Sequence, residues 1–121
     1  VFDVEWDNAG TRLFYSMSSG EVRVMSWPDE GLELLHTMEC HTSSCYGLAR
    51  DPTGRYLATG SADTLIGLWD LEEYICVRTI EAHEQPIGFT QFSFDGRFLA
   101  SFSDDSFVNI VSISSEVSYQ L

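Results

Sequence analysis

The sequence predicts an all-β protein built from three consecutive repeats of about 40 residues. Chemically different landmarks recur at one offset of 42 residues, namely Gly54 and Gly96, His41 and His83, Asp63 and Asp105, and Thr59 and Ser101. Residues 108–113 mix apolar and polar side chains and are rich in β-branched residues, which is typical of a strand. Glycines lie in the short turns at 51–54 and 94–96, where a hairpin needs a positive φ. Short strands joined by tight turns therefore form the repeating unit.

The first repeat, residues 1–39, is the weakest copy. Its segment 7–10 aligns with 51–54 at an offset of 44 residues. Strands are expected at 1–6, 12–17, 21–26 and 32–38. The last of these follows Gly31 and is too short for a stable helix, so we interpret it as an outer strand.

The second and third repeats, 40–80 and 81–121, are clearer copies of the same unit. In the second we expect strands at 45–50, 55–60, 65–70 and 74–80. In the third we expect strands at 87–93, 97–102, 107–112 and 117–121. Each repeat thus contributes four strands. No segment of the sequence sustains apolar residues at the 3.6-residue spacing of an amphipathic helix.

Four short strands per repeat are typical of a β-propeller blade, and one segment points to a particular family. Residues 58–70 read ATGSADTLIGLWD and resemble the WD40 signature, with its closing Trp-Asp pair. His83 and, less closely, His41 stand at the family's Gly-His position. The first repeat has Met25-Ser26 in place of Trp-Asp, and the third has Val111-Ser112. The resemblance implies three WD40 blades, of which the first is degenerate.

Three blades do not close a ring, because propellers have four to eight blades. The expected fold is therefore a propeller segment with two uncovered apolar faces. Such a segment should self-associate or need the remaining blades. We expect aromatic residues at strand spacing to form the core between blades, namely Phe89, Phe92, Phe94, Phe98 and Phe102.

The WD40 resemblance also implies a buried hydrogen-bond network in each complete blade. The second blade supplies His41, Thr59, Asp63 and Trp69, with the indole ending the network. The third supplies His83, Ser101 and Asp105, with Val111 where the Trp would be. A histidine, a hydroxyl and a carboxylate also make a hydrolase triad. Their recurrence in consecutive repeats, without a Gly-x-Ser-x-Gly elbow, favours an architectural role.

A zinc site is a second alternative. Two histidines and two cysteines lie within ten residues, namely His36, Cys40, His41 and Cys45. Their spacing does not pair Cys with Cys and His with His as a zinc finger does, and His41 already has a competing role. We therefore expect free thiols and no cofactor or metal.

Charge and composition restrict the partners. Six Lys plus Arg against nineteen Asp plus Glu give a formal net charge of −13. Direct high-affinity nucleic-acid binding would need a cationic surface, so we do not expect it. No apolar run is long enough to span a membrane. Three cysteines, an odd number, favour an intracellular, reducing compartment.

These features together predict a non-catalytic protein-interaction scaffold. Within the WD40 family, segment 51–79 is similar to a subunit of the nuclear mRNA transcription–export assembly. That similarity implies a nuclear location, a role in mRNA processing and export, and other protein subunits as partners. The alternative is a WD40 reader of peptides or modified tails, which would use aromatic and acidic residues around the mouth of the ring. An enzyme or a zinc protein is the remaining alternative.

Overall fold

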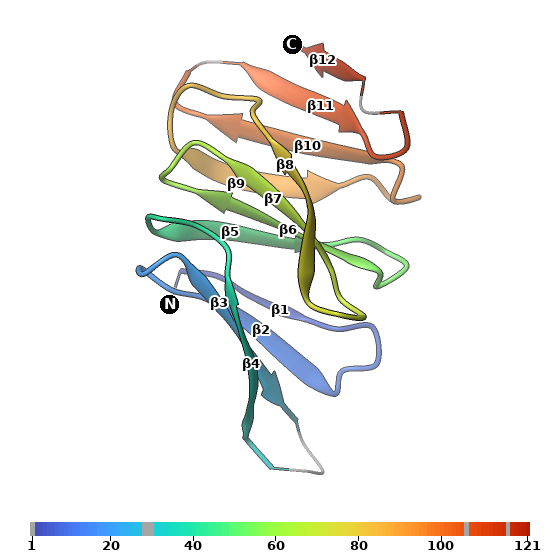
Figure 1. Ribbon diagram of the computed structural model, residues 1–121. Coiled ribbons are helices and arrows are strands. Elements are labelled where there is room, and N and C mark those ends of the chain that lie inside the picture. Colours follow the sequence, from blue (N-terminus) through green and yellow to red (C-terminus); the bar gives the residue numbers. More distant parts are fainter. Residues whose placement is uncertain (1, 28–30, 106, 116) are drawn as a thin grey trace.

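The computed structural model describes residues 2–27, 31–105, 107–115 and 117–121, which form three sheets stacked one after another (Figure 1). Each sheet has four antiparallel strands in sequence order. The first sheet contains β1 (Val4–Trp6), β2 (Arg12–Ser16), β3 (Glu21–Ser26) and β4 (Leu34–Glu39). The second contains β5 (Cys45–Arg50), β6 (Tyr56–Ser61), β7 (Ile66–Asp70) and β8 (Ile75–Ile80). The third contains β9 (Ile87–Phe92), β10 (Phe98–Ser103), β11 (Val108–Ser112) and β12 (Ser118–Gln120).

This architecture confirms the predicted all-β fold of three four-stranded units in an open arc. The sheets lie within 4–39, 45–80 and 87–120. Among the described residues, no helix is long and apolar enough to cross a membrane.

Strand alternation determines which residues face a neighbouring sheet. In β3, Val22 and Val24 are fully buried, whereas Arg23 between them is half-buried. The second sheet lies between the other two and is covered on both faces. Across β6 and β7, the pair Leu57 and Trp69 packs toward the first sheet, and the next pair, Ala58 and Leu68, packs toward the third.

Two apolar clusters hold the sheets together. The cluster between the first and second sheets consists of Phe14, Val22, Val24, Met38, Cys45, Leu48, Leu57 and Trp69. The cluster between the second and third sheets consists of Ala49, Ala58, Ile66, Leu68, Ile80, Ile87, Phe92, Leu99 and Val111. Burial of these side chains is the main favourable contribution to the stacking of the sheets.

Polar contacts add to the junction of the first two sheets. The backbone N–H of Leu48 donates to the Asp3 carboxylate at 3.0 Å. The backbone N–H of His41 donates to the Gly20 carbonyl at 3.0 Å. Gly20 has a φ of +93°, and a Cβ there would collide with backbone carbonyls of His41 and Ser43. Glycine is therefore required where the β2–β3 turn approaches the loop that carries His41.

The expected aromatic core is correct for only part of the set. Phe92 is buried between the second and third sheets. Phe89 and Phe102 stack with ring centroids 5.4 Å apart, but they are 46% and 47% exposed. They lie on the face of the third sheet turned away from the second, and no described segment covers that face. Phe94 is 98% exposed because it lies in the β9–β10 turn, beyond the end of the strand alternation.

Candidate functional site

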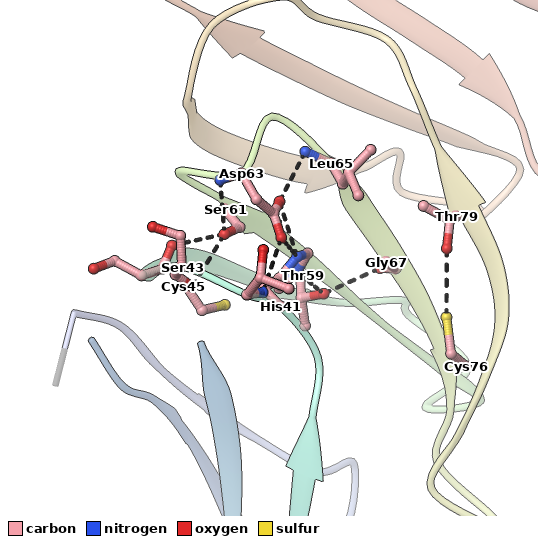
Figure 2. Close-up of polar contacts among 12 residues, drawn as sticks. His41, Ser43, Cys45, Thr59, Ser61, Asp63, Leu65, Gly67, Cys76 and Thr79 are labelled. Atoms are coloured by element: carbon pink, nitrogen blue, oxygen red, sulfur yellow. Dashed lines mark hydrogen bonds and ion pairs between the residues drawn. The ribbon is translucent and has the colours of Figure 1, made fainter. Parts of the chain in front are cut away.

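The second sheet carries a buried polar network centred on His41, in the loop between β4 and β5 (Figure 2). The Nδ1 atom of His41 lies 3.0 and 3.2 Å from the two carboxylate oxygens of Asp63. Its Nε2 atom lies 2.8 Å from the Thr59 hydroxyl. A neutral imidazole that donates from Nδ1–H to Asp63 and accepts at Nε2 from Thr59 satisfies all three groups.

Asp63 also connects two loops of the backbone. Its carboxylate accepts from the N–H of Leu65 at 3.0 Å and from the N–H of Thr42 at 3.2 Å. The imidazole is nearly inaccessible, with 2% of the His41 side chain exposed, against 11% for Asp63. Asp63 therefore couples the β6–β7 turn to the loop that enters the sheet.

Trp69 does not end this network, contrary to the expectation from the resemblance. Its indole Nε1 is buried and has no hydrogen-bond partner among the described residues. The Thr59 hydroxyl instead lies 3.5 Å from the carbonyl oxygen of Gly67. A Cβ on Gly67 would lie 2.7 Å from both the Thr59 hydroxyl oxygen and the indole nitrogen. Glycine thus leaves room for the two groups, but they do not bond to each other.

The third sheet contains a second network of the same form. The Nδ1 atom of His83 lies 3.0 and 3.1 Å from the carboxylate oxygens of Asp105, and its Nε2 atom lies 2.9 Å from the Ser101 hydroxyl. The backbone N–H of Glu84 also donates to Asp105 at 3.2 Å. The His83 ring stacks on Phe107 at 5.0 Å. Val111 is a buried apolar residue and adds no polar group.

Hydrogen bonds set the protonation of Asp105. Desolvation by burial acts to raise its pKa, but hydrogen bonding from Ser103, the Glu84 N–H and His83 favours the carboxylate, so the pKa of Asp105 is lowered. The ionised carboxylate is therefore the form that the third-sheet network stabilises.

Neither network is arranged for nucleophilic chemistry. The Thr59 and Ser101 side chains belong to residues that are 0% and 2% exposed. A substrate carbonyl could not reach either hydroxyl without displacing the adjacent sheet. The geometry matches a connection between loops and strands inside each sheet.

The candidate zinc ligands do not converge. His36 stacks on Tyr74 at 5.0 Å, while His41 is bonded to Asp63 and Thr59. Burial is the main cause that raises the pKa of the Cys45 thiol to about 12, and it also raises the pKa of Cys40. No group of three or more potential metal-ligating side chains occurs in the part of the protein that the structure describes.

The surface outside the networks contains one further polar feature that the sequence reasoning missed. Arg50 ends β5 beside a groove at the inner edges of the sheets, and its Nε is buried without a partner among the described residues. The sequence signal was weak, because Arg50 is one of six arginines spread over the protein. Its surroundings arise only from the stacking of three sheets.

Three stacked four-stranded sheets with paired His–Asp–hydroxyl networks define consecutive blades of a β-propeller. The family model "WD domain, G-beta repeat" (WD40) matches residues 32–70 and 74–112. The chain belongs to the WD40 repeat family. Each match begins in or near the last strand of one blade and ends in the third strand of the next, so the sequence repeat is offset from the structural blade.

Curated relatives support the family and show how much of a longer protein the chain matches. It is 39% identical over 113 residues to "THO complex subunit 3" of Arabidopsis thaliana, covering 93% of this chain and 35% of that protein. It is 39% identical over 95 residues to "WD repeat-containing protein AAC3" of Dictyostelium discoideum, covering 76% and 20%. The chain therefore spans about a third or less of the length of these relatives.

Solved structures show the same fold at low identity. "Structure of U3-55K" matches with a TM-score of 0.90 and 20% identity, over 98% of this chain and 38% of that one. The crystal structure of the Cps50 (Swd1) β-propeller domain of Myceliophteria thermophila matches with a TM-score of 0.83 and 18% identity, over 98% and 37%. This chain is thus similar to part of a longer chain in each case.

Proposed function

We propose that this chain is a segment of a non-catalytic scaffold subunit of the nuclear THO complex, acting in mRNA processing and export. The observation that carries the proposal is the 39% identity to THO complex subunit 3 over 93% of the chain. The identity to the AAC3 protein is equal but extends over only 76% of the chain. WD40 repeats typically mediate protein contacts. The hydroxyls of both networks are inaccessible, which agrees with a non-catalytic role.

The scaffold works by rigid display of loops. Asp63 and Asp105 each tie the turn between the second and third strands to the loop that enters the same blade. Because these loops are fixed to a packed core, a partner subunit meets them in a preformed arrangement and loses little entropy to ordering. Other protein subunits are the proposed partners, and nucleic acid is not.

The uncovered outer faces carry the second part of this proposal. A hollow of about 410 Å³ lies on the third blade, lined by Gln91, Phe92, Ser93, Phe98, Ala100 and Ile110. Apolar surface of this kind requires a cover. The remaining blades of a longer protein, or another copy of this segment, supply that cover.

Affinity purification from the source cells tests the proposed complex. The full-length protein, tagged and expressed at its native level, should co-purify with THO complex subunits after nuclease treatment. Nuclease resistance distinguishes a protein contact from a shared RNA. A similarly tagged, unrelated WD40 protein of the same cells is the matched control. Recovery of no THO subunit, or of the same set with the control, would overturn the assignment.

Direct RNA binding provides an independent test. With a net charge of −13, this segment lacks the electrostatic attraction on which non-specific RNA binding depends. Filter binding of the purified segment to a labelled single-stranded RNA at physiological salt should give no measurable retention. Tight, salt-sensitive retention would indicate a direct RNA reader instead of a scaffold.

A further inference from the structure

A groove runs along the inner edges of the three sheets. The first strands of the sheets lie side by side, because β1 contacts β5 and β5 contacts β9 (Figure 1). The groove has a volume of about 350 Å³ and includes Arg50, Glu5, Gln91, Phe89 and Phe94 in its walls. It lies apart from both histidine networks, whose residues do not line it.

Arg50 differs from every other arginine of the protein. Each of the other five interacts with a neighbouring group: Arg12 with Tyr74, Arg23 with Glu21, Arg55 with the Tyr56 ring, Arg78 with the Ile113 carbonyl, and Arg97 with Asp95. The Arg50 side chain forms no hydrogen bond, ion pair or ring contact with any described residue, and its Nε is fully shielded. In a protein with nineteen acidic residues, an arginine that contacts no carboxylate and no other partner among the described residues is conspicuous.

The burial of Arg50 makes this lack of a partner costly. The residue is half-buried at the end of β5, where a cation loses part of its hydration. Glu5 lines the same groove but forms no ion pair with Arg50; its carboxylate accepts from the Trp6 N–H at 3.2 Å. A planar guanidinium presents two parallel donors that match a carboxylate. A bound carboxylate would therefore restore the interactions that Arg50 lost on folding.

The rest of the groove indicates what accompanies the carboxylate. Leu48 and Phe94 line the groove with apolar side chains, and Phe94 is 98% exposed. An aromatic side chain so exposed next to a charged anchor is typical of a contact surface. The ligand should thus carry an apolar side chain beside its carboxylate. A polyanion such as RNA fits less well, because the groove offers one arginine and the protein is strongly acidic.

We propose that this groove binds a peptide segment of a partner protein through a carboxylate held by Arg50 and an adjacent apolar side chain packed on Phe94. The carboxylate comes from an Asp or Glu side chain or from the free carboxyl terminus of the partner. This binding goes beyond the scaffold role and does not depend on which complex the protein joins.

The test is a peptide titration of the full-length protein, whose arginine side chains are labelled with nitrogen-15. NMR follows the Nε–H signals of the arginines during the titration. The probes are the peptides acetyl-Ala-Phe-Asp-amide, with a side-chain acid, and acetyl-Ala-Phe-Ala with a free carboxyl terminus. Their controls are the Asn analogue of the first and the terminal amide of the second. We expect at least one acid to shift the Nε–H signal of Arg50 saturably, while its uncharged analogue does not. The acid that binds more tightly identifies the source of the carboxylate.

Substitutions separate the proposed roles. Arg50→Gln should lower the affinity for the acid peptide about tenfold or more, because the substitution removes the charge-assisted hydrogen bonds. Arg55→Gln is the matched control, because Arg55 lies at the end of the β5–β6 turn and does not line the groove. This substitution should leave the affinity unchanged. Phe94→Ser should also weaken binding, and its full exposure makes misfolding no explanation. Glu5→Gln should strengthen binding by removing a like charge.

Several results would overturn the proposal. Equal binding of the acid and amide peptides would remove the role of the carboxylate. Unchanged affinity in both the Arg50→Gln and Phe94→Ser variants would place the peptide elsewhere. A saturable shift of the Arg50 signal with inorganic phosphate or oligouridylate, but with neither acid peptide, would assign the groove to a phosphate ligand. All of these measurements use purified protein, so they are independent of the co-purification that tests the THO assignment.

Discussion

Removal of the Asp63 carboxylate should destabilise the protein far more than removal of a surface carboxylate. In the folded state Asp63 accepts from His41 Nδ1 at 3.0 Å, from the Leu65 N–H at 3.0 Å and from the Thr42 N–H at 3.2 Å. Asp63→Ala leaves the imidazole N–H buried without a partner, because 2% of the His41 side chain is exposed. Thr42 is exposed, so water can replace its lost bond.

The expected cost follows from these three donors. An unsatisfied buried donor costs about 1–3 kcal/mol, and the lost turn bond to Leu65 adds about 1 kcal/mol. We therefore expect Asp63→Ala to lower the free energy of unfolding by about 2–4 kcal/mol. Glu72→Ala is the matched control, since Glu72 is exposed in the β7–β8 turn and should change stability by no more than about 0.5 kcal/mol.

Urea denaturation followed by tryptophan fluorescence provides the measurement. The unfolding free energies of the two variants are compared with one shared m-value, the slope of the free energy against urea concentration. A double-mutant cycle with His41→Ala then isolates the pair. The two substitutions should be non-additive by about 0.5–3 kcal/mol, because each removes the same interaction. Equal small effects of Asp63→Ala and Glu72→Ala, or strict additivity in the cycle, would contradict the stabilising role of the His41–Asp63 pair.

The remaining predictions concern pH, thiol reactivity, backbone conformation and assembly. The pKa of Asp105 is lowered, so its contribution to stability is complete above the ordinary Asp pKa near ~4 and is lost as the pH falls through the lower folded value. Asp105→Asn should therefore flatten the decrease of the unfolding free energy on the acid side, and an unchanged slope would contradict this. The Cys45 thiol, with a pKa of about 12, should react with a disulfide reagent at a pH of about 8 much more slowly than the exposed Cys76. The fast phase of the reaction is assigned to Cys76, so Cys76→Ser should remove that phase. A fast phase that persists in this variant would contradict the assignment. Gly20→Ala should cost several times the ~1 kcal/mol expected for Gly10→Ala: φ is positive at both sites, but only Gly20 has backbone carbonyls where the Cβ would lie. Equal unfolding midpoints would argue against that steric clash. The isolated segment should self-associate through its uncovered faces, and light scattering that gives a stable 13.6 kDa monomer would exclude this.

The repeat pattern alone was sufficient to predict the architecture. An offset of 42 residues places the same chemical group at the same point of the second and third units, and an offset of 44 relates the weaker first unit to the second. Together with strand alternation, these offsets predict three four-stranded sheets, and the structure has them. These features are local, because turn residues and period-two patterns act within one hairpin. His41 and Asp63 come together for the same reason, since both lie at the loops of a single sheet.

Other properties depend on groups brought together across the fold. The indole of Trp69 and the hydroxyl of Thr59 both approach Gly67, yet side-chain geometry leaves the indole nitrogen without a partner among the described residues. No sequence pattern specifies such an orientation, because a small rotation of either side chain decides whether a hydrogen bond forms.

The exposure of individual side chains is the clearest division between sequence and tertiary structure. Alternation assigns Phe89, Phe92 and Phe102 to faces of the third sheet, but it does not say which face has a neighbour. Only the stacking order makes Phe92 buried and leaves Phe89 and Phe102 half-exposed. The surroundings of Arg50 likewise require the inner edges of separate sheets to meet. Strand formation depends on residues that are neighbours in sequence, whereas burial depends on surfaces supplied by distant segments.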